Sequence, residues 1–154
     1  MDKQQFIRRR QWLSALAAAP LALLLPGAAH GATQVTVHKL SSCGCCELWV
    51  EHLRAAGFEV TTRSVNDLDP IRARLGVPKN LASCHTALVD RYAIEGHVPA
   101  TEIRRLLRER PEVAGLAVPG MVLGSPGMEG PRRDPYEVLV FERNGATRVY
   151  ARYR

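Results

Sequence analysis

The chain has 154 residues, 46% of them hydrophobic and 23% charged, values typical of a single globular domain. Its net charge is +6, but half of this excess lies in the first thirty residues, so the remainder is too weakly basic to indicate a nucleic-acid-binding surface. Aromatic residues make up only 6% and form no stripe with basic residues, so we expect no nucleic-acid partner.

The first segment has the three parts of a secretory signal peptide. Polar and basic residues 1–12 precede an apolar stretch, residues 13–25, which small residues follow. The apolar stretch is about 13 residues long, whereas a membrane-spanning helix needs about 20. We therefore predict a signal peptide over residues 1–31, with cleavage after Gly31, and no membrane association of the chain after cleavage.

The basic part of this segment resembles a twin-arginine export signal. Residues 9–13 (RRQWL) contain two arginines, any residue, a large aromatic residue and leucine, with Trp12 where phenylalanine is usual. An ordinary secretory signal with a basic start is the alternative. Both routes predict a periplasmic location. The twin-arginine route carries folded proteins, which suits a site that is assembled before transport.

Hydrophobic periodicity predicts strands and helices from residue 34 onward. In chain order we predict a strand (34–40), a helix (46–56), a strand (58–65) and a short helix carrying Leu68, Ile71 and Leu75. Gly57 is placed to end the first helix, and Asp67 or Asp69 can cap the second. The first three elements form a βαβ unit, which predicts that its two strands pair in parallel.

The second half of the chain is rich in hairpin signals. We predict a hairpin of residues 86–89 and 92–95, a helix from Pro99 bearing Ile103, Leu106 and Leu107, a loop over residues 121–131, and a hairpin of residues 137–142 and 147–153. Asn144-Gly145 between the last two strands is a strong turn signal. These elements predict an α/β fold, with a central mixed sheet flanked by helices, in one domain over residues 32–154.

Three of the four cysteines lie within four residues. Cys43 and Cys46 have C-x-x-C spacing between a predicted strand and helix, where the helix N-terminus stabilises a thiolate. Cys45 adds a third thiol, which would invite scrambling of a redox dithiol, and Gly44 lets the backbone turn. Three thiols in so short a segment therefore favour metal binding.

The residue types restrict the metal. Thiolates favour Cu(I), zinc and iron–sulfur clusters. Structural zinc and iron sites usually draw on two separated C-x-x-C pairs, whereas here one cluster is joined by the distant Cys84. Cu(I) accepts two or three ligands and forms multi-copper thiolate clusters, so we predict one or several Cu(I) ions, with zinc less favoured. The candidate ligands are Cys43, Cys45, Cys46, Cys84, His85 and Met128.

The other candidate side chains carry weaker signals. His85 is considered because it follows Cys84, and Met128 because thioethers bind copper outside the reducing cytoplasm. His38 is a minor candidate ligand, whereas we predict that His52 is solvated, that His97 is structural, that Met121 is in the core and that Trp49 packs the first helix onto the sheet.

Two alternatives to copper binding remain open at this point. A thiol–disulfide oxidoreductase would use Cys43 and Cys46 and would need a cis-proline opposite them, for which Pro78 and Pro119 are the candidates. A zinc-binding or disulfide-stapled module would instead hold zinc or structural bridges without redox turnover.

Several motifs together resemble the CopG-type periplasmic copper-resistance proteins. They are residues 37–39 (VHK), 43–46 (CGCC) followed by Trp49 and His52, 76–78 (GVP), 83–87 (SCHTA), 94–99 (IEGHVP) and 124–129 (GSPGME), and the match covers about residues 33–142. The resemblance implies a thioredoxin-like fold and copper bound by Cys43, Cys45, Cys46 and Cys84. It also implies a role in copper redox handling. We predict that the protein serves copper resistance and homeostasis by sequestering copper, passing it to other periplasmic copper-handling proteins, or interconverting Cu(I) and Cu(II).

Overall fold

The structure is a computed structural model that describes residues 31–154. The predicted signal peptide, residues 1–31, lies outside the described residues except for Gly31. Within the described part of the chain, no helix combines the length and the apolar character that crossing a lipid bilayer requires.

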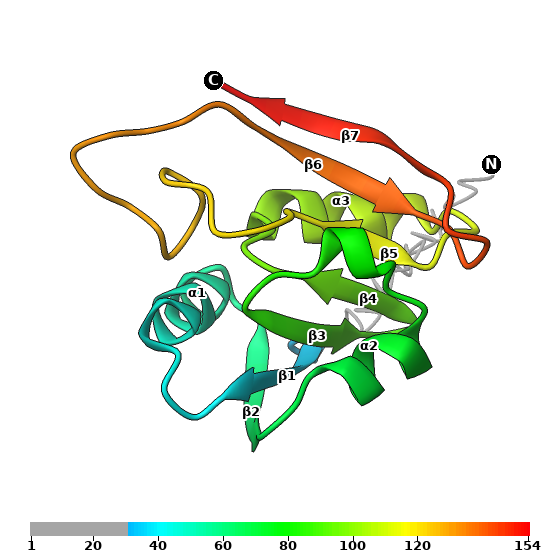
Figure 1. Ribbon diagram of the computed structural model, residues 1–154, viewed down its shortest axis with the longest axis horizontal. Coiled ribbons are helices and arrows are strands. Elements are labelled where there is room, and N and C mark those ends of the chain that lie inside the picture. The colour runs from blue at the N-terminus through cyan, green and yellow to red at the C-terminus, as the bar shows by residue number, and fades with distance from the viewer. Residues whose placement is uncertain (1–30) are drawn as a thin grey trace, which may run out of the picture.

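Seven strands form one mixed sheet in the order β2-β1-β3-β4-β5-β6-β7 (Figure 1). The strands are β1 (Gln34–Leu40), β2 (Glu59–Val65), β3 (His85–Val89), β4 (Tyr92–Glu95), β5 (Gly115–Ala117), β6 (Tyr136–Phe141) and β7 (Thr147–Tyr153). The pairs β1–β2 and β4–β5 are parallel and all others are antiparallel. The α/β class, the parallel βαβ pairing and both hairpins are confirmed. Strand β5 was not predicted.

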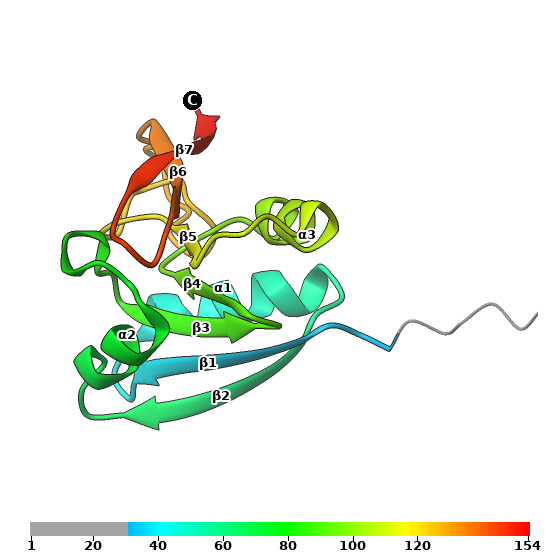
Figure 2. The same cartoon turned by 90° about the vertical axis from the view of Figure 1, so that its right-hand side faces the viewer.

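Three α-helices flank the sheet in the described residues: α1 (Gly44–Ala55), α2 (Asp69–Leu75) and α3 (Ala100–Glu109). Helices α1 and α3 bury apolar side chains such as Trp49 and Ile103 in one large core with Val37 of β1. Helix α2 is joined to the other face of the sheet through Arg72, which contacts Glu95 of β4. A 3₁₀ turn (Lys79–Leu81) leads from α2 to β3. Figure 2 shows how strongly the sheet twists from β2 to β7.

The loop of residues 119–131 folds back onto the first turn of α1. Gly127 has φ +82°, and a Cβ atom there would lie 2.7 Å from the backbone nitrogen of Trp49 and 2.9 Å from the carbonyl oxygen of Cys45. The loop is closed on itself by two backbone hydrogen bonds, in which Gly124 donates to Met128 and Met128 donates to Ser125, both at 2.8 Å. Glycine is therefore required at residue 127 for the approach of this loop to α1.

A buried charge holds the residue before Cys84 in place. The carboxylate of Glu95 is fully buried and accepts hydrogen bonds from Ser83 N–H (2.7 Å), Thr86 Oγ1 (2.6 Å) and Arg72 Nε (2.9 Å). Arg72 also donates to Ser83 O, and Ser83 Oγ donates to Gly120 O. We call Arg72, Ser83, Thr86 and Glu95 the Ser83 clamp.

The Ser83 clamp combines the unfavourable burial of a carboxylate with favourable hydrogen bonds and an ion pair to it. Burial raises the pKa of Glu95, while the hydrogen bonds from Thr86 and Ser83 and the charge of Arg72 act in the opposite direction. Because the donors around the carboxylate suit its ionised form, the cost of burying it is offset only while all of them remain. The segment that leads into Cys84 is therefore fixed by a network that depends on each of its members.

Replacement of Gly127 by alanine tests the contact between the loop and α1. We expect Gly127→Ala to lower the free energy of unfolding by about 1–3 kcal/mol, because the new Cβ atom meets backbone atoms and φ is positive. Gly130→Ala, in the same loop with open space around its Cβ position, should change it by less than about 0.5 kcal/mol. Chemical denaturation measures both. Equal stability of the two variants would contradict the packing.

Replacement of Arg72 by methionine tests the Ser83 clamp. We expect Arg72→Met to destabilise the protein by about 3 kcal/mol, because it leaves the carboxylate of Glu95 buried without its cation. Arg74→Met, an exposed position on the same helix, should cost less than about 0.5 kcal/mol. The double variant Arg72→Met/Glu95→Gln should recover part of the loss, since no buried charge remains. A double variant less stable than Arg72→Met would argue against the clamp.

Candidate metal centre

The sulfur cluster lies at the N-terminus of α1. Cys43 is the N-cap residue, with extended backbone angles (φ −83°, ψ 95°), and no side chain caps the helix. The first turn of a helix leaves backbone N–H groups without intrahelical partners, and its dipole favours negative charge nearby. Three cysteine side chains therefore originate where the backbone itself favours anionic sulfur.

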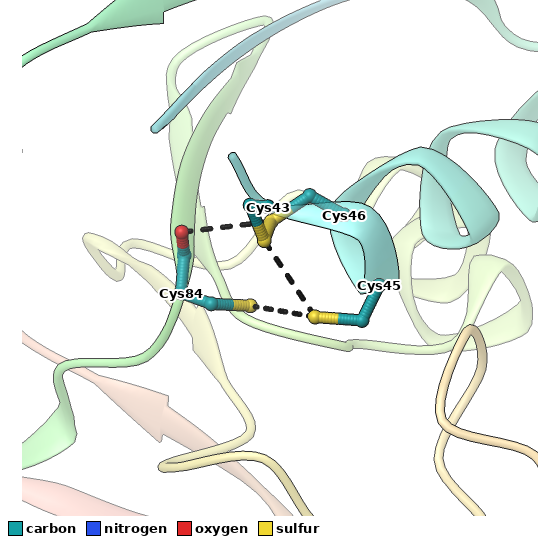
Figure 3. Close-up of side chains that lie close together, drawn as sticks. All are labelled: Cys43, Cys45, Cys46 and Cys84. Carbon is teal, nitrogen blue, oxygen red and sulfur yellow. Dashed lines mark hydrogen bonds between the residues drawn. A yellow bond between two sulfur atoms is a disulfide. The ribbon is translucent and has the colours of Figure 1, made fainter. Parts of the chain in front are cut away.

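Cys84, the residue immediately before β3, joins this cluster (Figure 3). The Sγ atoms of Cys45 and Cys84 are 3.9 Å apart, those of Cys43 and Cys45 are 3.6 Å apart, and Cys46 Sγ is 3.6 Å from the backbone oxygen of Cys84. All four sulfur atoms lie within 4.8 Å of one another. The structure thus brings together the four cysteines that the sequence predicts to share a site.

Two of these sulfurs are joined in the structure. Cys43 and Cys46 form a disulfide, whereas Cys45 and Cys84 are free thiols. Cys46 is fully buried, and the other three cysteines are half-buried. The cluster is therefore shown in a partly oxidised state, with one bridge and two thiols side by side.

Two histidines complete the surroundings of Cys84. His97 Nε2 lies 3.0 Å and His85 Nδ1 lies 3.4 Å from Cys84 Sγ. His97 Nδ1 lies 2.7 Å from the carbonyl oxygen of Pro126, which can only accept, so the ring proton belongs on Nδ1 and Nε2 presents its lone pair towards the sulfur. Cys84, His85 and His97 form a second group whose possible ligand atoms lie within 4.8 Å of one another.

Burial keeps the groups around Cys84 uncharged. Burial, with the neighbouring Cys45, raises the pKa of Cys84 to about 12. Burial, with the nearby His97, lowers the pKa of His85 to about 3, and burial also lowers the pKa of His97. The Nε2 atom of His85 is buried without a hydrogen-bond partner. A neutral imidazole has a nitrogen lone pair available, which is the form that binds metals.

The histidine predictions have mixed outcomes. His85, a predicted candidate ligand, lies beside Cys84, and its ring packs against that of Trp49 with centroids 4.2 Å apart. His97 was predicted to be structural, but it contacts Cys84 directly.

His52 was predicted to be solvated, yet its Nε2 accepts a hydrogen bond from Ala100 N–H at the start of α3. His38 is paired in register with Thr86 and so faces the side of the sheet that the Ser83 clamp occupies.

The two methionines differ from each other. Met128 follows Gly127 in the loop that lies on α1, and its side chain is half-buried, so its segment lies close to the cluster. Met121 was predicted to be in the core, but it is 58% exposed. The prediction for Trp49 is confirmed, since it is fully buried against the sheet and its Nε1 donates to Val98 O.

The available donors fit a soft metal ion. The site offers four sulfurs and, beside one of them, two imidazole nitrogens. Neither of these two ligand groups, which lie within residues 31–154, contains a carboxylate. Such a set suits Cu(I) and zinc and disfavours calcium or magnesium, which prefer oxygen. The chain thus carries a cysteine cluster able to bind a metal ion.

Comparisons with known proteins agree with this chemistry. A protein-family model described as a protein of unknown function, DUF411, matches residues 81–128, which include Cys84, His85, His97 and Met128. No curated protein sequence matches the chain.

Two solved structures resemble the whole described domain. Both are of the copper resistance protein CopG. Form 2 is 47% identical, with a TM-score of 0.76, and the alignment covers 80% of this chain and 99% of the other. Form 1 is also 47% identical, with a TM-score of 0.75, and covers 79% and 98%. On this identity over nearly all of the solved chains, the protein belongs to the family of CopG copper resistance proteins.

Proposed function

We propose that the protein binds Cu(I) through the thiolates of Cys43, Cys45, Cys46 and Cys84, with copper as its cargo. The observation that carries the proposal is the convergence of the four sulfurs, all within 4.8 Å of one another. Thiolates select soft ions, chiefly Cu(I), zinc and iron–sulfur clusters. The family to which the chain belongs includes proteins named for copper resistance, which favours copper among these.

The arrangement supports binding of more than one ion. Cys84 is a member of both ligand groups, one with the three other cysteines and one with His85 and His97. A thiolate has several lone pairs and can bridge two Cu(I) ions, so a shared sulfur suits a multinuclear centre. We also propose Met128 as a thioether ligand, supplied by the loop that lies on α1.

The full set of sulfur donors exists only in the reduced protein. A disulfide sulfur carries no thiolate charge, so the Cys43–Cys46 bridge must take up two electrons and two protons and become two thiols before all four side chains can bind. Loss of two protons then gives two thiolates. Copper binding and the redox state of the cluster are therefore linked in this proposal.

The remaining parts of the proposal concern location and role. The C-x-x-C pair at the N-terminus of α1, just after β1, supports a thioredoxin-like arrangement of the domain over residues 32–154. The signal-like residues 1–31 support export, by the twin-arginine route, to the periplasm. There the protein would sequester copper, pass it to other copper-handling proteins, or interconvert Cu(I) and Cu(II) for copper homeostasis.

A thiol–disulfide oxidoreductase is the second candidate, because Cys43 and Cys46 form a disulfide at a helix N-terminus. This candidate expects a cis-proline opposite the dithiol. Every peptide bond within residues 31–154 is trans, including those before Pro78 and Pro119. It also gives no role to the contact between Cys84 and His97. Copper binding accounts for more of the geometry.

Metal analysis after anaerobic reduction tests the copper proposal. We expect the reduced protein to retain at least one copper per chain, and Cys45→Ser or Cys84→Ser to weaken Cu(I) binding by more than about tenfold, because each removes a sulfur donor. Ser42→Ala, an exposed neighbour, should leave binding unchanged. Competition with a chromogenic Cu(I) chelator measures the affinities. Insulin reduction that survives loss of Cys45 and Cys84, without copper binding, would favour the oxidoreductase instead.

His97→Ala tests the part of the site that sequence reasoning missed. We expect it to lower Cu(I) affinity by about 10- to 100-fold, because His97 either binds the metal or orients Cys84. His38→Ala is the matched control, since His38 lies on the opposite face of the sheet. The same chelator competition, with reduced protein, compares the two. Equal affinities of the His97 and His38 variants would remove His97 from the site.

A further inference from the structure

Short contacts connect the four sulfurs in turn, within a compact cluster in which every pair lies within 4.8 Å. Cys46 is bonded to Cys43, Cys43 Sγ lies 3.6 Å from Cys45 Sγ, and Cys45 Sγ lies 3.9 Å from Cys84 Sγ (Figure 3). These two gaps are close to van der Waals contact between sulfur atoms. A thiol in contact with a disulfide is placed for thiol–disulfide exchange, which proceeds by direct attack of one sulfur on another.

We propose that the cluster is an internal thiol–disulfide relay, in which the bridge moves from Cys43–Cys46 to Cys45–Cys84 with Cys45 as the intermediate. The proposal concerns the metal-free protein and needs no external oxidant or reductant, because the number of disulfides does not change. It gives Cys45 a role that a simple C-x-x-C pair lacks.

The relay has two steps that balance. First the Cys45 thiolate attacks Cys43 Sγ, a Cys43–Cys45 bond forms, and the Cys43–Cys46 bond breaks to leave the Cys46 thiolate. Then the Cys84 thiolate attacks Cys45 Sγ, a Cys45–Cys84 bond forms, and Cys43 leaves as a thiolate. The protons lost by Cys45 and Cys84 are taken up by Cys46 and Cys43, so no net charge or electron is exchanged with solvent.

The surrounding backbone accommodates both products. Gly44, the residue between Cys43 and Cys45, has no atom within 4 Å of its Cβ position, so the backbone that the intermediate bridge would span is not crowded. The released Cys46 thiol already has a hydrogen-bond acceptor, the backbone oxygen of Cys84 at 3.6 Å. Each exchange brings a sulfur pair from contact distance to the bond length of about 2.0 Å, which side-chain rotation can supply.

A cavity beside the cluster makes two of its cysteines accessible to small thiols. Its volume is about 250 Å³, and its lining includes Cys43 and Cys84 but neither Cys45 nor Cys46. An external low-molecular-weight thiol can therefore attack Cys43 when the bridge is Cys43–Cys46, and Cys84 when the bridge is Cys45–Cys84. Both positions of the bridge are thus reducible from one opening: a first external thiol forms a mixed disulfide and releases one cysteine, and a second external thiol releases the other cysteine and leaves with the first as a disulfide.

The relay would determine which two cysteines remain available to copper, because each position of the bridge removes a different pair of donors. This consequence rests on the proposed function. The relay itself is tested without metal. If it fails, the four reduced thiols can still bind copper, and if copper binding fails, the exchange can still be observed. The two proposals therefore have separate outcomes.

Peptide mapping of the bridge is the experiment. Metal-free protein is fully reduced, given one equivalent of diamide, and equilibrated anaerobically at mildly alkaline pH. It is then quenched in acid, blocked with N-ethylmaleimide and digested with trypsin. Trypsin cuts after Lys39 and Arg54 and after Lys79 and Arg91, so the cluster lies in one peptide and Cys84 in another. A bridge to Cys84 then joins two peptides, whereas the Cys43–Cys46 bridge joins none.

We expect the linked pair to appear in the wild-type protein within about tenfold of the unlinked bridge, a ratio that corresponds to about 1.4 kcal/mol. In Cys46→Ser every bridge should contain Cys45, joined to Cys43 or to Cys84. In Cys45→Ser the linked pair should vanish while Cys43–Cys46 still forms. The relay is overturned if the wild type forms only Cys43–Cys46, or if Cys45→Ser still yields the linked pair.

Discussion

The antiparallel pairing of Lys39 with His85 decides where the site lies. Strand β1 ends at Leu40 and leads directly into the cysteine turn, while β3 begins at His85, one residue after Cys84. Because these strands are antiparallel neighbours, the end of one and the start of the other meet at the same edge of the sheet. A shift of this register by one residue would turn His85 to the other face and move Cys84 away from α1.

Two largely buried cations, Lys39 and Arg72, lie near this end of the sheet. Lys39 is only 5% exposed and pairs with Glu47 in the first turn of α1 at 2.8 Å, and Arg72 is fixed in the Ser83 clamp. Both cations contribute to the lowered pKa of His85, although burial and His97 contribute more. Burial of these cations costs stability, and the ion pairs with Glu47 and Glu95 offset part of that cost.

Sequence reasoning succeeds here where the signal is local. Periodicity and turn residues locate α1, both hairpins and the parallel βαβ unit, and the density of cysteines locates the site. Strand β5 was missed because it has only three residues, Gly115–Ala117, too few to show alternation. His97 and His52 were misjudged because their partners, Cys84 and Ala100, are distant in sequence and meet only through the fold.

Glu95, Gly96 and His97 illustrate contacts that cannot be predicted from the sequence. Glu95 holds Ser83, His97 contacts Cys84, and Gly96 between them has φ +70° and a Cβ position 2.5 Å from Ser83 Oγ. The three residues therefore act on one neighbouring segment, each in a different way. The sequence shows that these three residues are adjacent, but only the fold shows that all three contact the segment of Ser83 and Cys84.

The cluster combines two chemistries that exclude each other at any one sulfur. A sulfur in a disulfide cannot serve as a thiolate ligand, and a sulfur bound to a metal cannot attack a disulfide. With four sulfurs in mutual reach, the number available to a metal is set by the number of bridges: four with none, and two with one. A fixed scaffold that brings the sulfurs this close therefore makes metal capacity depend on the redox state of the cluster, without a moving domain or lid.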